Sequence, residues 1–213
     1  MGIGELYKAE GDNMRVFLAV NLQAELQAEL AQIQDRLRKK IKGVRWVAPP
    51  LLHITLKFLG EQDEAALCIL EKSLQELGEK TAAFTLSLAG LGAFPSLNNP
   101  RVLWIGTEEG TRQLCNLAEE IEQRSKILNF QQHSEQYSKG KPLRVSRQQF
   151  RPHITLGRKK KKGEILGAAN NIFTEPRVCK NKLWVDRFCL MQSKLYPTGP
   201  VYTTVREFLF KKN

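Results

Sequence analysis

The sequence lacks any apolar run approaching the roughly 20 residues that a membrane-spanning helix needs, which argues against a transmembrane protein. It has few cysteines, no Cys-x-x-Cys pair, and no histidine at zinc-ligand spacing beside a cysteine. Buried, reduced thiols are therefore expected at Cys68, Cys115, Cys179 and Cys189. The first 13 residues lack the apolar core of a signal peptide. Together these absences favour a reducing, cytoplasmic location and no membrane partner.

Acidic residues are in short supply. The chain has 22 Asp and Glu against 33 Lys and Arg, a formal net charge of +11. Such a surplus favours an anionic partner, with nucleic acid first, although a merely soluble basic surface is the simpler alternative. At 213 residues, the chain is one large domain or two small lobes that share a core. A core of this size needs neither metal nor disulfide to fold.

Hydrophobic periodicity predicts the secondary structure. Strands are expected at about 15–20, 51–60, 84–91, 101–107, 151–158, 183–195 and 202–210. Helices are expected at about 22–41, 63–78 and 111–128, with a doubtful short one near 165–170. The polar stretch at 129–148 has no clean period and is expected to form a long loop.

This order predicts an α+β fold. Two similar strand-helix-strand halves, at about 14–92 and 101–210, suggest a duplication. The closing pair of strands and the Pro/Asn turn before residue 101 favour antiparallel sheets flanked by helices over a parallel sheet. We therefore expect one domain over 14–213. If its two halves pack about a pseudo-two-fold axis, their faces meet across a central cleft. Residues 1–13 are expected to be a disordered leader.

The same tetrapeptide, His-Ile-Thr-Leu, occurs once in each half. It comprises His53, Ile54, Thr55 and Leu56 in the first half and His153, Ile154, Thr155 and Leu156 in the second. The chain has only three histidines, so two matched copies indicate an internal repeat. The third, His133, lies in the polar stretch and is expected to be exposed and inert.

Side chains alternate along a strand, so each copy should present its imidazole and hydroxyl on one face and its aliphatic residues on the other. By this parity, Phe58 belongs with the buried Ile54 and Leu56. Two imidazoles facing one cleft suit displacement at phosphorus, because one can remove a proton from the attacking oxygen while the other protonates the departing oxygen. A lone histidine of this kind would more often be a satisfied core residue, but two matched copies argue against that reading.

The chain resembles the 2H phosphoesterase superfamily, and within it the bacterial and archaeal RNA 2′,3′-cyclic phosphodiesterases, historically called 2′-5′ RNA ligases. The resemblance covers about residues 14–210 and rests on the segments MRVFLAV, LHITLKFLG, RVLWIG and PHITLGR. It implies a bilobal α+β fold and metal-independent hydrolysis of 2′,3′-cyclic phosphate ends of RNA to 2′-phosphate ends. Neither a cofactor nor a metal is implied, and we expect a monomer.

The resemblance also assigns roles. It makes His53 the general acid (proton donor) and His153 the general base (proton acceptor), although the residues alone leave the two histidines equivalent. Thr55 and Thr155 would bind the phosphate, and Arg158 matches an arginine that follows the second motif in such enzymes. By strict alternation Arg158 falls on the core face, so it reaches phosphate only if the strand ends or bulges at Gly157.

A basic block surrounds the second motif. Its ten members are Lys139, Lys141, Arg144, Arg147, Arg151, Arg158, Lys159, Lys160, Lys161 and Lys162, with no acidic residue between them. Such a block attracts a phosphodiester backbone, although a solvated loop face remains an alternative. Trp46, Phe94 and Trp104 could stack on a base, but core packing is at least as good an explanation for each.

Other functions remain open. The chain could be a non-catalytic RNA-binding module of the same fold, or an enzyme that also joins related 2′,5′-linked ends at a low level without ATP. An ATP-dependent ligase is disfavoured, because neither a G-x-x-x-x-G-K-[ST] loop nor a K-x-D-G-type lysine motif is present. Metal-dependent hydrolysis is disfavoured too, since no acidic or histidine cluster lies near either motif.

Overall fold

The computed structural model describes residues 13–136, 150–160, 165 and 179–211. The expected leader, apart from Asn13, lies outside these residues. The doubtful helix near 165–170, apart from Ile165, lies outside them as well. So do six of the ten residues of the basic block; Arg151, Arg158, Lys159 and Lys160 are described.

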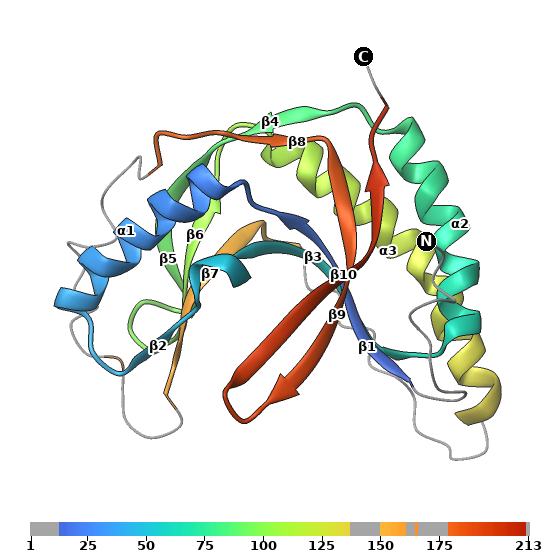
Figure 1. Ribbon diagram of the computed structural model, residues 1–213, viewed down its shortest axis with the longest axis horizontal. Coiled ribbons are helices and arrows are strands. Elements are labelled where there is room, and N and C mark those ends of the chain that lie inside the picture. Colours follow the sequence, from blue (N-terminus) through green and yellow to red (C-terminus); the bar gives the residue numbers. More distant parts are fainter. Residues whose placement is uncertain (1–12, 137–149, 161–164, 166–178, 212–213) are drawn as a thin grey trace.

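The described residues form ten strands and three α-helices (Figure 1). The strands are β1 (Met14–Asn21), β2 (Val44–Trp46), β3 (His53–Gln62), β4 (Phe84–Leu86), β5 (Leu88–Pro95), β6 (Pro100–Thr107), β7 (His153–Lys159), β8 (Leu183–Val185), β9 (Arg187–Tyr196) and β10 (Gly199–Leu209). The helices are α1 (Ala24–Lys40), α2 (Glu64–Lys80) and α3 (Thr111–Gln136), with a short 3₁₀ helix at Pro49–Leu51.

The strands form an open, antiparallel, 8-stranded sheet and a small 2-stranded one. The large sheet runs β10-β9-β1-β3-β7-β6-β5, and β2 pairs with β7. The small sheet joins β4 to β8. With the α-helices on the sheet, this is the expected α+β class.

The order of strands in the large sheet reflects the repeat seen in the sequence. In chain order, β1, β3, β4 and β5 of the first half correspond to β6, β7, β8 and β9 of the second, and α1 corresponds to α3. Under this correspondence the path β9-β1-β3-β7-β6-β5 maps onto itself when read backwards. The pseudo-two-fold axis therefore passes between β3 and β7.

The two halves of the sheet do not coincide with the two halves of the sequence. The first lobe contains β1, β3, β9 and β10, and the second contains β2, β5, β6 and β7. Strand β5 thus leaves the first sequence half to pair with β6, and β9 leaves the second to pair with β1. Because each lobe takes strands from both halves, neither sequence half can complete a lobe alone.

A continuous core lies between the helices and one face of the sheet. Helix α1 buries one stripe, formed by Leu26, Leu30, Ile33 and Leu37. Helix α2 is capped as expected by Asp63, whose side chain accepts a 2.8 Å hydrogen bond from the backbone N–H of Ala66. The opposite face of the sheet carries no helix among the described residues and is called the site face below (Figure 1).

Two expected strands are each broken in two. The stretch 84–91 divides at Ser87 into β4 and β5, and the stretch 183–195 divides at Asp186 into β8 and β9. Ser87 is bound through its backbone and hydroxyl to the backbone of Glu108 and Glu109, at 3.0–3.1 Å. At each break the chain passes from the small sheet to the large one. The hydrophobic pattern along the segment does not reveal this change of sheet.

The other differences concern segment ends. Helix α3 continues to Gln136, so the first eight residues of the expected loop at 129–148 are helical, and residues 137–149 are outside the described part. No Gly or Pro lies between Thr111 and Gln136, so nothing local ends the helix at Leu128. Strand β2 was not expected; Gly43, with φ +77°, precedes it.

The expectation of four buried thiols is half wrong. All four cysteines are free, but Cys68 is exposed on α2 and Cys115 is half-buried on α3, whereas Cys179 and Cys189 are buried. Within the described residues, no helix combines the length and apolar character needed to cross a membrane.

Candidate active site

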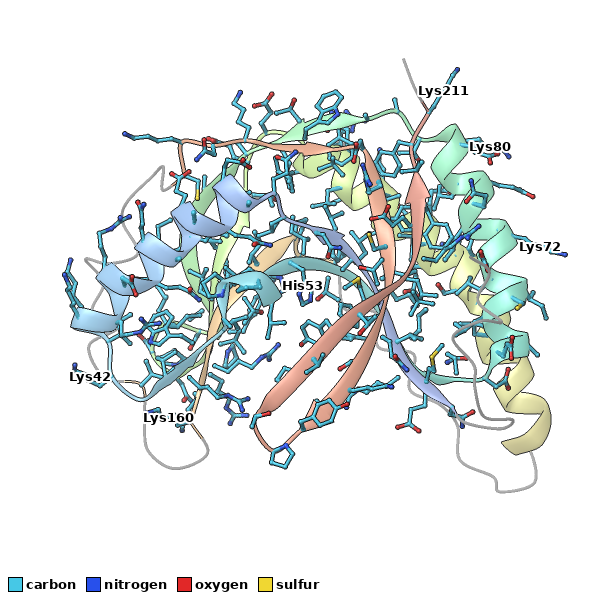
Figure 2. All side chains as sticks on the ribbon, in the orientation of Figure 1. Lys42, His53, Lys72, Lys80, Lys160 and Lys211 are labelled. Carbon is cyan, nitrogen blue, oxygen red and sulfur yellow. The ribbon has the colours of Figure 1, made fainter. Side chains whose placement is uncertain are left out.

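The two His-Ile-Thr-Leu motifs meet at the pseudo-two-fold axis. Strands β3 and β7 are joined by one antiparallel pair, Ile54 opposite Ile154, and both isoleucines are fully buried on the helix face. Their neighbours His53, Thr55, His153 and Thr155 are all partly exposed on the site face. Antiparallel register places His53 toward Thr155 and His153 toward Thr55. Figure 2 shows His53 near the centre of the molecule.

Each motif ends in a β-bulge at its leucine. On β3, Thr55 pairs with Ala19 and Lys57 with Leu18, so Leu56 has no partner on β1. On β7, Thr155 pairs with Trp104 and Gly157 with Leu103, so Leu156 has no partner on β6. A bulge of this kind shifts the parity of the side chains that follow it.

The bulges turn one further residue of each strand toward the site face. Lys57 points to the helix face, where its ammonium group pairs with Glu122 of α3. The next residue, Phe58, is 67% exposed, so its expected place in the core is wrong. In the second motif Gly157 is buried and Arg158 is exposed, so the bulge places Arg158 on the face of His153 and Thr155.

Both imidazoles are oriented by a backbone carbonyl two residues earlier in the chain. Nδ1 of His53 lies 2.8 Å from the Leu51 oxygen, and Nδ1 of His153 lies 2.7 Å from the Arg151 oxygen. A carbonyl can only accept, so we assign the proton of each neutral imidazole to Nδ1. Nε2 is then the proton-accepting atom in both rings. In His53 it lies 3.0 Å from Oγ1 of Thr55, whose hydroxyl can donate to it.

Aromatic rings surround each histidine. The His53 ring lies 5.0 Å from Phe17 and 5.4 Å, edge to face, from Tyr202. The His153 ring lies 5.0 Å, edge to face, from Phe94. It lies 6.2 Å from Trp104, whose indole packs over Gly92, where a Cβ would come within 2.2 Å of the ring. Two of the three aromatic residues singled out from the sequence, Phe94 and Trp104, thus contact a motif histidine.

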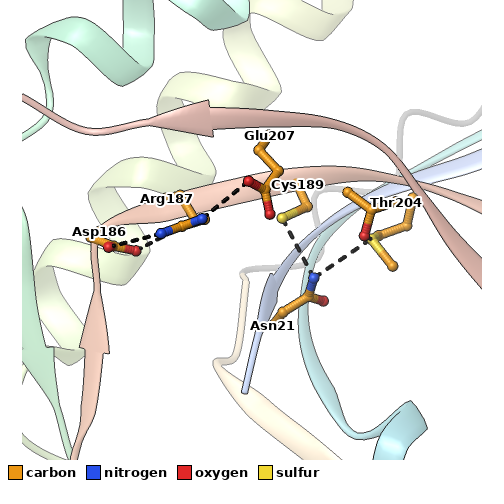
Figure 3. A network of polar contacts seen from close by, with 7 residues as sticks. Asn21, Asp186, Arg187, Cys189, Thr204 and Glu207 are labelled. Carbon is orange, nitrogen blue, oxygen red and sulfur yellow. Dashed lines mark hydrogen bonds and ion pairs between the residues drawn. The ribbon is translucent and has the colours of Figure 1, made fainter. Parts of the chain in front are cut away.

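A second, smaller core supports His53 from the first lobe. It is formed by Phe17, Ala19, Cys189 and Met191, with Tyr202 packed against it. Asn21, which pairs with His53 across β1 and β3, donates its amide to Sγ of Cys189 (3.5 Å) and Sδ of Met191 (3.9 Å; Figure 3). This packing holds the β1 end of the site in place.

The pKa of each motif histidine is lowered from 6.5. Burial among the aromatic rings is the main cause, because it disfavours the cation. The hydrogen bond to the backbone carbonyl raises each pKa in part, and the charge of Arg158 lowers both. His153 also lowers the pKa of His53 slightly. A single guanidinium group therefore acts electrostatically on both imidazoles.

Arg45 is a candidate that the sequence did not reveal. It lies on β2 directly opposite Arg158 of β7, and both side chains are exposed. Directly opposed residues of an antiparallel pair point to the same face, and like charges there repel each other. An anion between the two guanidinium groups would remove that repulsion. Strand β2 has three residues, too few to show a period, so no sequence signal could have indicated this position.

A buried side chain of α1 supports the second bulge. Gln34 is 1% exposed, and its amide nitrogen donates to the carbonyl oxygens of Val47 and Leu156, both at 2.8 Å. The Leu156 oxygen also accepts from the Val47 N–H at 3.0 Å. Because Leu156 is the bulged residue, Gln34 helps to fix the strand geometry that directs Arg158.

Two other sequence candidates lie apart from this site. Trp46 packs against the main core, with the Arg38 guanidinium 6.0 Å above its ring. His133 belongs to α3, but its side chain is outside what the structure describes. Within the described residues, no group of three His, Cys, Asp or Glu side chains is arranged to hold a metal ion.

Comparison with known proteins identifies the family. A family model described as LigT-like phosphoesterase matches residues 20–104 and 117–202, one segment for each motif. The chain belongs to the LigT-like phosphoesterase family. The resemblance to the 2H phosphoesterase superfamily seen in the sequence is thereby confirmed, and with it the expectation of a phosphoesterase.

Relatives of this LigT-like phosphoesterase match over nearly their whole length. The chain is 33% identical to an RNA 2′,3′-cyclic phosphodiesterase of Aquifex aeolicus, covering 92% of this chain and 96% of the relative. It is 34% identical to one of Archaeoglobus fulgidus, covering 92% and 99%. A crystal structure of a Thermus thermophilus protein superposes with a TM-score of 0.73 at 31% identity, covering 93% and 98%. These likenesses confirm the α+β fold.

Replacing Gln34 by leucine should affect both stability and the site. The Val47 oxygen would lose its partner, which costs about 1–3 kcal/mol of unfolding free energy for a buried group. Displacement of Arg158 should lower kcat/KM by up to about 100-fold and raise the pKa of both histidines. The measurements are denaturant unfolding, kinetics and NMR titration of the imidazoles.

Gln32→Leu, on the exposed side of the same helix, is the control. Lower stability with unchanged pKa values and kcat/KM would assign Gln34 a role in folding only.

The histidine pKa values can be tested directly. Because both pKa values lie below 6.5, both imidazoles should be neutral at pH 7 in the free enzyme. The singly protonated pair is most populated between the two pKa values. If the two histidines act as acid and base, kcat/KM should therefore be greatest below pH 6.5. Arg158→Gln removes a nearby positive charge, so both pKa values should rise in an NMR titration. Values that do not change in this variant would contradict the electrostatic role given to Arg158.

Proposed function

We propose that this protein hydrolyses 2′,3′-cyclic phosphate ends of RNA to 2′-phosphate ends by two-histidine acid–base catalysis without a metal. The observation that carries the proposal is the meeting of two His-x-Thr pairs around the Ile54–Ile154 pair, on one face of the sheet. The names of the Aquifex and Archaeoglobus relatives supply the substrate class. Two imidazoles supply the chemistry, because each directs Nδ1 to a backbone carbonyl and so leaves Nε2 as the proton-transferring atom.

In the proposed reaction, His153 acts as the base and His53 as the acid. Nε2 of His153 takes a proton from water as the water oxygen attacks phosphorus. The bond from phosphorus to the 3′ oxygen breaks, and the protonated Nε2 of His53 gives its proton to that oxygen. The products are a 2′-phosphate and a 3′-hydroxyl, and proton exchange with solvent restores both histidines. In the free site Nε2 of His53 faces Thr55, so binding of the substrate would replace this contact.

The phosphate would be bound by neighbouring groups on the same face. Thr55 and Thr155 can each donate a hydroxyl proton to a non-bridging oxygen. Arg158 acts on both imidazoles electrostatically, a position suited to the negative charge between them. Charge-assisted hydrogen bonds to a guanidinium group are about twice as strong as neutral ones.

A basic patch beside the site supports RNA as the substrate. It comprises Lys42, Arg45, Arg158 and Lys160, which lie around β2 and the end of β7. The backbone N–H of Lys160 donates to the Gly43 oxygen at 2.9 Å, and Figure 2 shows Lys42 and Lys160 on the same side of the molecule. Such a patch binds phosphates with little dependence on sequence and releases counterions, so RNA affinity should fall with salt.

The direct test is turnover in the presence of EDTA. An oligoribonucleotide ending in 2′,3′-cyclic phosphate should be hydrolysed, and the product should carry a 2′-phosphate. Activity should survive chelation, since imidazole and guanidinium groups carry the mechanism. Loss of activity with EDTA, followed by rescue with Mg²⁺, Mn²⁺ or Zn²⁺, would overturn the mechanism. RNA binding without turnover under any condition would favour the non-catalytic RNA-binding module.

The two histidine roles can be separated by substitution. A general acid or base contributes about 10²–10⁴-fold, so His53→Ala and His153→Ala should each lose at least about 100-fold in kcat. RNA affinity should be largely kept, because other groups bind the phosphate. The double variant should lose far less than the product of the two effects, since the residues act together.

A substrate with a more acidic leaving group assigns the roles. A nitrophenyl phosphodiester needs little protonation of its leaving oxygen, so it should partly rescue His53→Ala and not His153→Ala. Rescue of His153→Ala alone would reverse the assignment. Near-normal turnover by either variant would exclude the two-histidine mechanism.

A further inference from the structure

Arg45 is an exposed cation beside the site that the acid–base mechanism does not use. It lies on β2 directly opposite Arg158 of β7, on the site face. The charge of Arg158 lowers the pKa of both motif histidines, whereas the charge of Arg45 is not among the causes of either shift. Arg158 is therefore placed to act on the reacting phosphate, and Arg45 is a second cation next to it, further from the imidazoles.

The protein does not neutralise this pair of arginines. Among the described residues, no carboxylate lies within ion-pair distance of Arg45 or Arg158. By contrast, Arg38 pairs with an aspartate at 2.6 Å and Arg187 with another at 3.0 Å. Two guanidinium groups on directly opposed residues repel each other. Their position therefore favours a ligand that carries negative charge at both.

Strand β2 is fixed to β7 on both sides of Arg45. Before Arg45, the backbone N–H of Lys160 donates to the Gly43 oxygen at 2.9 Å. After it, the backbone N–H of Val47 donates to the Leu156 oxygen at 3.0 Å. The backbone that carries Arg45 is thus held in place in the free protein, and a ligand does not have to order it.

The pairing of β7 places Arg45 on the side of the departing ribose. This step rests on the proposed function. One edge of β7 pairs with β6, and the other edge pairs with both β2 and β3. The 3′ oxygen leaves toward His53, the first residue of β3, and it stays attached to the terminal ribose. That ribose therefore lies on the same side of β7 as Arg45.

We propose that Arg45 binds the phosphodiester on the 5′ side of the terminal nucleotide, and that it thereby selects the ends of RNA chains over single nucleoside 2′,3′-cyclic phosphates. In an RNA chain, this phosphodiester is the nearest backbone charge to the terminal cyclic phosphate. A single nucleoside has a 5′ hydroxyl there, which gives Arg45 nothing to neutralise. Arg158 then acts on the reacting phosphate and Arg45 on the next one. A phosphate contact carries no sequence information, so the selection is for chain ends of any sequence.

Three matched substrates test the proposal. The first is adenosine 2′,3′-cyclic phosphate, the second is the same compound with a 5′-phosphate, and the third is the dinucleotide ApA ending in a 2′,3′-cyclic phosphate. In the wild type, kcat/KM should be at least about 10-fold higher for the second and third than for the first, because a charge-assisted contact is added. This preference should disappear in Arg45→Gln. Arg45→Lys keeps the charge and should keep part of the preference.

A surface cation elsewhere provides the control. Lys72→Gln removes an exposed cation on α2, which Figure 2 shows on the other side of the molecule from Lys160. This variant should keep the full preference. Loss of the preference in Lys72→Gln as well would assign it to the overall charge of the protein and overturn the proposal.

A binding measurement without turnover gives an independent result. Calorimetry should show that the wild type binds adenosine 2′,5′-bisphosphate more tightly than adenosine 2′-phosphate. The difference should shrink as salt is added, because the additional contact is made to a phosphate. Arg45→Gln should bind the two compounds with nearly equal affinity.

The outcomes separate this proposal from the proposed function. If the wild type hydrolyses none of the three substrates, the proposed function fails, and calorimetry still decides whether Arg45 binds a 5′-phosphate. Absence of any preference in the wild type would overturn the proposal without the need for a variant. A preference that persists in Arg45→Gln would overturn it as well. An equal fall in kcat for all three substrates in Arg45→Gln, with a rise in the pKa of both histidines, would instead place Arg45 at the reacting phosphate.

Discussion

One backbone pairing, Ile54 opposite Ile154, places the histidines and threonines of the two motifs next to each other. It is the point where the two lobes of the large sheet are joined, and each histidine and threonine of the motifs is a neighbour or next neighbour of it. Exchange of β5 and β9 between the lobes and the pairing of β4 with β8 stabilise this junction. A change in the angle between the lobes would move the two imidazoles relative to each other, and the proposed proton transfer at phosphorus requires both within hydrogen-bond reach.

Duplication supplied the shared geometry, and divergence after the motifs supplied the asymmetry. Both copies keep the carbonyl that orients Nδ1, the aromatic neighbours of the imidazole, and the bulge at leucine. They differ where the bulge turns the next side chain outward, with Phe58 in one copy and Arg158 in the other. The two copies therefore place an aromatic ring and a cation at equivalent points of the site face.

Alternation along single strands predicted most of the site but could not detect the bulges. His53, Thr55 and their counterparts lie on the face expected from parity, and Ile54 and Leu56 lie in the core. Parity failed at Phe58 because a bulge depends on the register with a neighbouring strand. Arg158 was identified through the resemblance, and its place on the site face required the irregularity that Gly157 permits. Three features depend on contacts between segments far apart in the sequence, so the pattern within one segment could not predict them. They are the place of Arg45 opposite Arg158, the hydrogen bonds of Gln34, and the exchange of β5 and β9 between the lobes.

The lowered histidine pKa values and the acid–base chemistry fit together once the substrate's charge is included. In the free site, burial and Arg158 both oppose protonation, so the pair carries little positive charge at neutral pH. An anionic phosphate placed between the rings has the opposite effect, because a nearby negative charge favours the imidazolium form. It also offsets the charge of Arg158. In the proposed mechanism, substrate binding thus favours uptake of a single proton by the pair, which matches a reaction that uses an acid on one side of phosphorus and a base on the other.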